Sequence, residues 1–190
     1  MRFPAARRIK RFVTTYSLPL LLASILFVYS LSLFNGFVSD DRAILTSTPS
    51  QTFVSIVAHT TVPLRALLYE LIFNVFGSNA VAFRIPNILF HAINTLLVYG
   101  LIRTTAPPVL ALLIAALFGL HPIHVESVAW ISGGVYPQYA FFFLLSLFFY
   151  SRSQTKNRVY LYLSLIFFVF SLLSSEKAVS LFGLSNISCC

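Results

Sequence analysis

The stretch YSLPLLLASILFVYSLSLFNGFV (residues 16–38) decides the fold class. It contains no charged side chain, and an α-helix needs about 20 predominantly apolar residues to cross the hydrocarbon core of a bilayer. Five of the thirteen Lys and Arg residues lie within residues 1–15, just before this run. The run is too long for a cleaved signal peptide. We therefore predict a basic cytoplasmic tail over residues 1–15, followed by an uncleaved signal anchor.

The composition extends this prediction to a membrane protein with several spans. Of the 190 residues, 58% are hydrophobic and only 9% are charged, whereas soluble proteins carry about 25% charged residues. A net charge of +8 could indicate nucleic-acid binding, but the basic tail supplies much of it. We therefore predict membrane lipids as partners and exclude nucleic acid.

Further apolar runs predict an all-α, polytopic transmembrane helix bundle of about five spans over residues 16–184. Residues 185–190 are expected to form an irregular tail. A separate, shorter helix is expected from Pro63, because residues 64–76 repeat apolar side chains with helical spacing but are too few to span. We expect it to lie in the interface on the outer face of the membrane. The four later spans are predicted at residues 83–102, 109–120, 136–150 and 159–173.

This threading places the charges unequally on the two sides of the membrane. One side holds nine basic residues and no acid, and the other holds four basic residues and all five acids. Because cytoplasmic loops carry the excess of Lys and Arg, the N-terminus is expected in the cytoplasm. Carboxylates gathered on one aqueous face indicate a reaction site on the outer side: Asp40, Asp41, Glu70, Glu126 and Glu176.

Two motifs on that side have residue types suited to catalysis. The pair Asp40-Asp41 directly follows the first span, where it is either a solvated loop start or a general base or cation ligand. The motif HPIHVE (residues 121–126) combines two histidines and a glutamate that could hold a metal or bind phosphate oxygens. Histidines beside a helix-breaking proline at the interface are the alternative explanation.

Polar side chains also recur along one face of the second span. Such groups are expensive inside a membrane, so they either form hydrogen bonds between helices or contact a ligand. They are Arg84, Asn87, His91 and Asn94. An aromatic belt at the interface explains three further residues, Trp130, Tyr136 and Tyr139.

Several of these segments together resemble a known family. In order along the chain they are the acidic pair, the outer helix, Asn87-x-x-x-His91-x-x-Asn94, HPIHVESVAWISG (residues 121–133) and SEKA (residues 175–178). The pattern is similar to the N-terminal membrane region of the transmembrane-and-TPR O-mannosyltransferases and their bacterial relatives, within the GT-C glycosyltransferases. The resemblance covers roughly residues 30–180. It departs at Gly134-Val135-Tyr136, where the family usually has an arginine and an acidic residue.

The resemblance implies transfer of mannose or another hexose from a polyprenyl-phosphate-linked donor to a protein or glycan acceptor. The reaction would take place on the periplasmic face of a bacterial cytoplasmic membrane, or on the luminal face of the endoplasmic reticulum. Asp40 or Asp41 would be the catalytic base. Substrate-binding residues near the donor phosphate would be Arg84, His91, His121, His124, Glu126 and Lys177. Some GT-C enzymes use a divalent cation, here Mg²⁺ or Mn²⁺, with Asp41, His124 and Glu126 as candidate ligands.

Two alternative functions remain open at this stage. The chain could be a non-catalytic, truncated membrane scaffold, or a subunit of a lipid or solute transporter whose polar stripe lines a path. We expect the 190-residue chain to be the N-terminal part of a larger enzyme, and to be inactive on its own.

Overall fold

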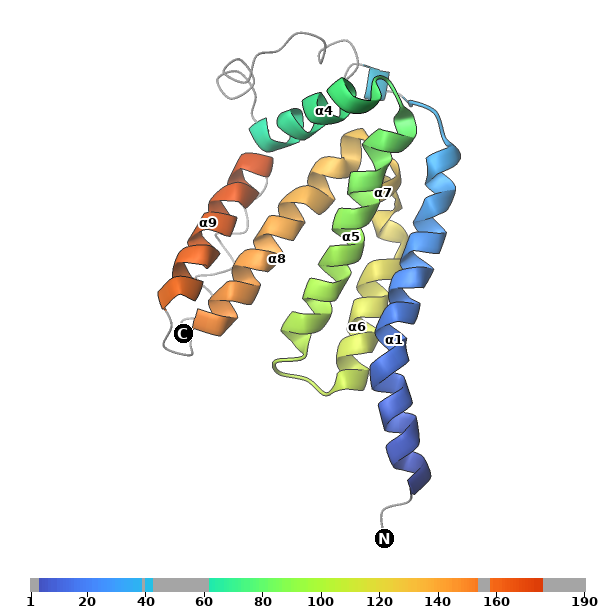
Figure 1. The fold of residues 1–190 in the computed structure, drawn as a ribbon, viewed down its shortest axis with the longest axis vertical. Helices are drawn as coiled ribbons and strands as arrows, with labels where there is room; N and C mark the ends of the chain where they lie inside the picture. Colours follow the sequence, from blue (N-terminus) through green and yellow to red (C-terminus); the bar gives the residue numbers. More distant parts are fainter. Residues whose placement is uncertain (1–3, 39, 43–61, 154–157, 176–190) are drawn as a thin grey trace.

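The computed structural model describes residues 4–38, 40–42, 62–153 and 158–175, with side chains from residue 16 onward. This part of the chain is all α, as predicted, with short 3₁₀ turns between some of the helices (Figure 1). The α-helices are α1 (Pro4–Ser30), α4 (Pro63–Phe76), α5 (Ala80–Ile102), α6 (Pro108–Leu120), α7 (Val125–Ala129), α8 (Val135–Ser153) and α9 (Arg158–Ser174).

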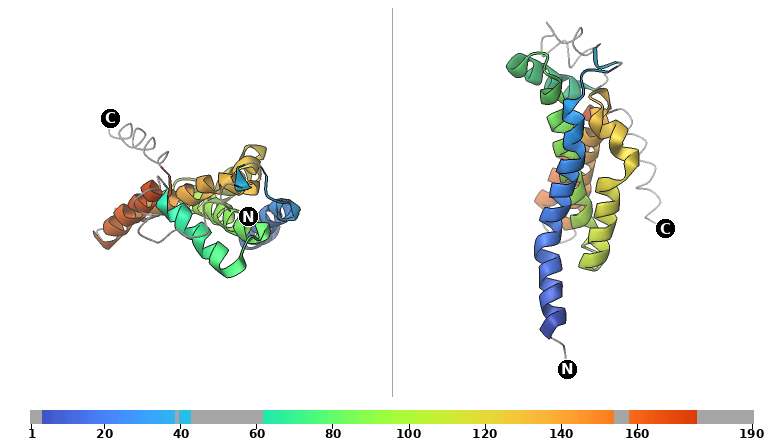
Figure 2. Two further views of the ribbon diagram at one scale, coloured as in Figure 1. Left: turned by 90° about the horizontal axis from the view of Figure 1, so that it is seen from above. Right: turned by 90° about the vertical axis from the view of Figure 1, so that its right-hand side faces the viewer.

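The helices form a bundle with one crossing helix at its end. Helices α1, α5, α6, α8 and α9 run along a common direction, and α4 lies across one end of them (Figures 1 and 2). Helix α5 packs against α1, α6 and α8, and α9 packs on α8. The helix predicted from Pro63 is therefore confirmed as α4, and the end of the bundle that it covers is called the α4 end below.

Local sequence signals explain where these helices begin and end. Pro63 begins α4 at a position where its missing N–H costs nothing, and Gly77 ends it with φ 60°. The side chain of Asn79 caps α5 by accepting a hydrogen bond from the backbone N–H of Val81 at 3.0 Å. Helix α6 ends at Leu120, directly before His121-Pro122.

Two helices within the described ranges are long and apolar enough to cross a membrane, at Tyr16–Phe34 and Ala80–Ile102. A third span is possible if α6 and the segment Pro122–Ala129, which bend by 43° at the proline, count as one. Helix α9 is apolar but has only 17 residues. The structure thus supports two to three candidate spans, and the count of five stays a prediction.

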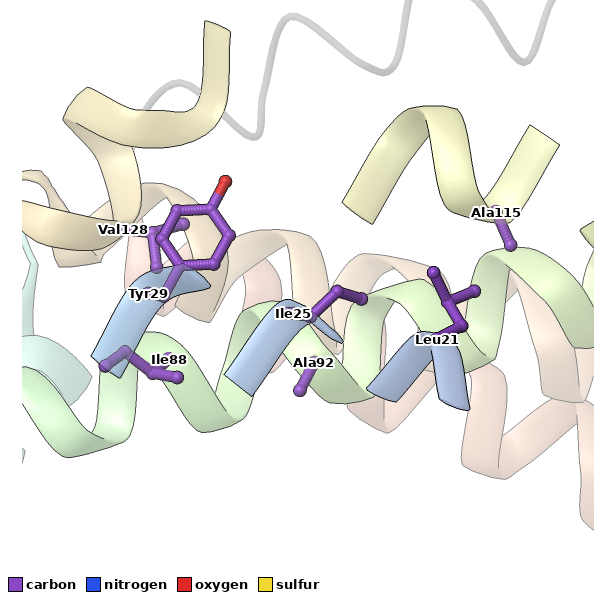
Figure 3. Close-up of a cluster of buried hydrophobic side chains, with 7 residues drawn as sticks. All are labelled: Leu21, Ile25, Tyr29, Ile88, Ala92, Ala115 and Val128. Carbon is purple, nitrogen blue, oxygen red and sulfur yellow. The ribbon is translucent and has the colours of Figure 1, made fainter. Parts of the chain in front are cut away.

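The larger of two buried hydrophobic clusters in the described part of the chain lies where α1 packs against α5, α6 and α7. Figure 3 shows the buried side chains that α1 places between these helices. Gly119 lets α6 come close, because a Cβ there would lie 2.5 Å from Cδ1 of Ile25 and 2.9 Å from Oγ1 of Thr95. The cluster consists of Leu21, Ile25, Tyr29, Ile88, Ala92, Ala115 and Val128.

Candidate functional site

The carboxylate of Asp41 joins the acidic pair to the segment 121–133, which contains the two histidines. Oδ1 of Asp41 accepts hydrogen bonds from the backbone N–H of Ser132 at 3.0 Å and from its hydroxyl at 2.8 Å. Oδ2 accepts one from the backbone N–H of Val38 at 3.2 Å. Asp41 is fully buried, whereas Asp40 is exposed. The two acids of the pair therefore have different surroundings, and two segments 91 residues apart are joined at the α4 end.

Arg84 fixes the segment that leads to the acidic pair. Its guanidinium donates to the backbone carbonyls of Asn35 and Gly36, and its Nε donates to the carbonyl of Ala129 at 3.0 Å. These carbonyls belong to the chain after α1 and to the end of α7. Arg84 thus holds both segments against the start of α5.

A second buried arginine, Arg65 of α4, binds neutral acceptors from three other segments. Its Nη2 donates to Tyr69 Oη at 2.9 Å, to Asn87 Oδ1 at 2.6 Å and to the Ile131 carbonyl at 3.2 Å, and Nη1 donates to Gln138 Oε1 at 3.3 Å. The Tyr69 hydroxyl in turn donates to the Ile131 carbonyl at 2.6 Å. Burial raises the pKa of the Tyr69 phenol, although the Arg65 guanidinium lowers it in part, so the hydroxyl keeps its donor proton. This network holds α4 against α5, α8 and the segment around Ile131.

Two cavities open beside α7, and Glu126 lines both of them. The smaller has a volume of about 380 Å³ and is called the arginine cavity: Asn35, Val38, Arg84, Val125, Glu126, Ala129 and Trp130. The larger has a volume of about 420 Å³ and is called the histidine cavity: His91, Asn94, Phe118, Ile123, His124, Glu126, Ser127, Tyr136, Pro137, Tyr139 and Ala140.

Packed rings form one wall of the histidine cavity. The His124 ring lies 4.8 Å from Phe118 and 5.2 Å from His91, measured between centroids. Nε2 of His91 lies 3.0 Å from the Gly119 carbonyl, which can only accept, so this nitrogen carries the proton. Asn94 donates to the Pro137 carbonyl at 2.9 Å, while its buried Oδ1 has no hydrogen-bond partner.

The predicted site residues therefore divide into groups. His91, His124 and Glu126 come together at the histidine cavity, whereas Arg84 lies at the arginine cavity. His121 lines neither, and its Nδ1 accepts from the Ile123 N–H at 3.2 Å, which caps the turn after α6.

The remaining predictions concern the metal ligands and the last motif. Within the described residues, no three His, Cys, Asp or Glu side chains are grouped so that they could hold a metal ion. Asp41, His124 and Glu126 are thus not assembled as a metal site there. Lys177 and the tail at 185–190 lie outside the described residues.

Sequence reasoning missed part of the cavity wall. Tyr136 and Tyr139, which it explains as an interfacial belt, both line the histidine cavity, and Trp130 lines the arginine cavity. The spacing of three residues, which places both tyrosines on one face of α8, was the available signal. The polar Gln138 within the apolar α8 could likewise have indicated a buried hydrogen bond.

Comparisons with known proteins find protein O-mannosyl-transferases among the relatives of this chain. The human protein O-mannosyl-transferase TMTC1 is 33% identical over 134 residues, which cover 64% of this chain and 15% of the human protein. The mouse TMTC1 is 31% identical over 134 residues, with 64% and 14% coverage. The Drosophila melanogaster Tmtc1 is 31% identical over 121 residues, with 62% and 14% coverage. The chain thus spans only 14–15% of these relatives' length, and no solved structure gives a significant match.

A family model described as dolichyl-phosphate-mannose-protein mannosyltransferase matches residues 58–184. The matched region includes the Arg65 network, Arg84 with the end of α7 that it binds, and every residue of the histidine cavity. It covers more than half of the 190 residues. The chain belongs to the dolichyl-phosphate-mannose-protein mannosyltransferase family.

Proposed function

We propose that this protein takes part in mannose transfer from dolichyl-phosphate mannose to a hydroxyl group of a protein acceptor, at the luminal face of the endoplasmic reticulum membrane. The hydrogen bonds between Asp41 and Ser132 carry this proposal. They join the acidic pair to the segment 121–133. An acid–base transfer reaction needs these two motifs close together. The family match supports the donor and the acceptor class.

The two aspartates take different roles in this proposal. Asp40 is exposed, so an acceptor hydroxyl can reach its carboxylate, which would accept the proton as the hydroxyl oxygen attacks the sugar. Asp41 is buried and accepts three hydrogen bonds, so it positions the segment that bears Asp40. The lipid phosphate is the leaving group of the reaction.

Hydrogen bonding along the polar stripe gives the transporter alternative less support. Arg84, Asn87, His91 and Asn94 each bind at least one backbone carbonyl of a neighbouring segment. Side chains that hold helices together in this way are the expected use of polar groups inside a membrane. The transferase proposal needs no continuous polar path.

Binding of the donor lipid tests the proposed function. The longest product that the gene encodes is purified in detergent and titrated with radiolabelled dolichyl-phosphate mannose, and unlabelled dolichyl-phosphate mannose or the water-soluble sugar nucleotide GDP-mannose serves as competitor. We expect saturable binding that the lipid displaces and GDP-mannose does not. Absence of saturable binding, or equal displacement by both competitors, would contradict the proposal.

The proposal also requires that the α4 end face the lumen. In the described residues all four acids belong to this end, together with Arg42, Arg65 and Arg84. The other end of the bundle has no acid among the described residues. It holds the start of α1 with four basic residues, Arg103 after α5, Arg152 in the last turn of α8 and Arg158 at the start of α9 (Figure 1). By the positive-inside rule, the end with more basic residues is cytoplasmic, and we propose the five-span threading on this basis.

Single cysteines on either side of α5 test this orientation. Ser78 and Thr104 are exposed and flank the 23 residues of α5, a length of about 35 Å. Each is replaced by cysteine in a background in which Cys189 and Cys190 are serine, and sealed microsomes are treated with a membrane-impermeant maleimide. We expect Thr104→Cys to react in intact vesicles and Ser78→Cys only after permeabilisation. The opposite pattern would place the acidic pair in the cytoplasm.

A further inference from the structure

The histidine cavity has the size of a binding site for a small molecule. Its volume of about 420 Å³ lies within the usual range of roughly 300–1,000 Å³ for ligand pockets. Four helices contribute to its wall, namely α5, α6, α7 and α8, which the core and the Arg65 network hold together. The cavity is thus formed by packed helices and lies within one end of the bundle.

The polar groups of this cavity favour hydroxyl groups over phosphate. Asn94 is 1% exposed, and its Oδ1 is a buried acceptor without a partner. Glu126 adds a carboxylate, and none of the lining residues is Lys or Arg. A phosphate group requires cations or several donors and is repelled by a carboxylate. A ligand with several hydroxyl donors satisfies both acceptors.

The apolar part of the wall is aromatic. Phe118, Tyr136 and Tyr139 line the cavity together with Ile123 and Ala140. The face of an aromatic ring is negative, so it attracts C–H groups that carry partial positive charge. A sugar ring presents such C–H groups on its faces and hydroxyl groups around its rim. Its shape and chemistry therefore match both parts of the wall.

We propose that the histidine cavity is the subsite for the sugar of the lipid-linked donor, with the phosphate bound outside it. This proposal rests on the proposed function and makes it specific. It changes the role expected for His124 and Glu126, which then contact the hexose rather than the donor phosphate. Glu126 also lines the arginine cavity, so it places the sugar next to the segment that Arg84 holds beside the acidic pair.

The test compares two lipids that differ only in the sugar. Affinities of the longest purified product of the gene for dolichyl phosphate and dolichyl-phosphate mannose are measured for the wild type, Glu126→Gln and Tyr139→Leu. Glu70→Gln is the matched control, because Glu70 is a partly exposed glutamate of α4 that lines neither cavity. We expect each cavity variant to bind dolichyl-phosphate mannose roughly 10-fold more weakly, with unchanged affinity for dolichyl phosphate. Glu126→Gln weakens a hydrogen bond to a charged group, and Tyr139→Leu removes an aromatic contact.

The possible outcomes separate this proposal from the proposed function. If both cavity variants change the affinity for the two lipids equally, or change neither, the cavity is not the sugar subsite, although the protein still binds its donor. If Glu126→Gln tightens dolichyl phosphate binding, the phosphate lies in the cavity and the proposal is wrong. If the wild type binds neither lipid, the proposed function fails and this proposal fails with it.

Discussion

Replacement of Asp40 by asparagine is expected to lower mannose transfer by roughly 100-fold or more, the scale of losing a general base. Asparagine keeps the size of the side chain but cannot accept the proton of the acceptor hydroxyl. The measurement is incorporation of radiolabelled mannose from dolichyl-phosphate mannose into protein, by membranes that contain the longest product that the gene encodes. Donor binding should stay unchanged, because the base acts on the acceptor.

The neighbouring Asp41→Asn variant is the matched comparison. The amide of the introduced asparagine would retain one carbonyl oxygen for Ser132 or Val38 but not both acceptor positions, so we expect a lower unfolding temperature and a smaller loss of transfer. The opposite result would be a loss of transfer of about 100-fold in Asp41→Asn at unchanged stability, with normal transfer by Asp40→Asn. It would show that Asp41 is the general base and that the two roles are reversed.

Gly134→Ala is expected to destabilise the α4 end strongly. A Cβ at this position would overlap Nη2 of Arg65 and Oδ1 of Asn87, which are hydrogen-bonded to each other at 2.6 Å. Both side chains are buried, so they cannot move without losing hydrogen bonds. Overpacking of this kind costs about 1–3 kcal/mol. For a chain of this length, a loss of about 2 kcal/mol lowers Tm by roughly 4–8 °C, measured by thermal unfolding in detergent.

Gly36→Ala provides the control for this prediction. A Cβ at Gly36 would meet no atom within 4 Å, and the carbonyl that binds Arg84 remains in place. We expect its Tm to stay within about 2 °C of the wild type, the usual range for substitutions that disturb no packing. Equal Tm values for the two alanine variants would show that the Arg65 network does not fill the space beside Gly134.

Most of the helices could be predicted from the sequence because their causes are local, although α1 ends at Ser30 rather than at residue 38 and the short α7 was not predicted. Apolar run length, Pro63, Gly77 and Pro122 each act within a few residues, and α4 and the break after α6 occur where these signals place them. The gathering of the described acids at one end also followed, since it depends only on the order of helices and loops.

The details of the site could not be predicted, because they depend on tertiary packing. Nothing in the sequence indicates that Asp41 rather than Asp40 binds Ser132. Arg65 is a charged residue within the apolar repeat of α4, yet it is only 3% exposed, because neutral acceptors from Asn87, Gln138 and the Ile131 carbonyl converge on it.

Gly134 illustrates the same limit. In the structure, Arg65 and Asn87 occupy the space that a side chain at Gly134 would need. The absence of a side chain at Gly134 thus leaves room for a guanidinium that arrives from α4, which no local pattern reveals.

Mannose transfer by the wild-type protein is the most direct measurement of the proposed function. Microsomes that contain the longest product of the gene are compared with microsomes that lack it, using dolichyl-phosphate mannose labelled in the sugar. The predicted result is label in an acceptor protein that α-mannosidase removes, and none when GDP-mannose replaces the lipid in washed, dolichyl-phosphate-depleted membranes. Equal protein labelling in the presence and absence of the product would contradict the proposed function.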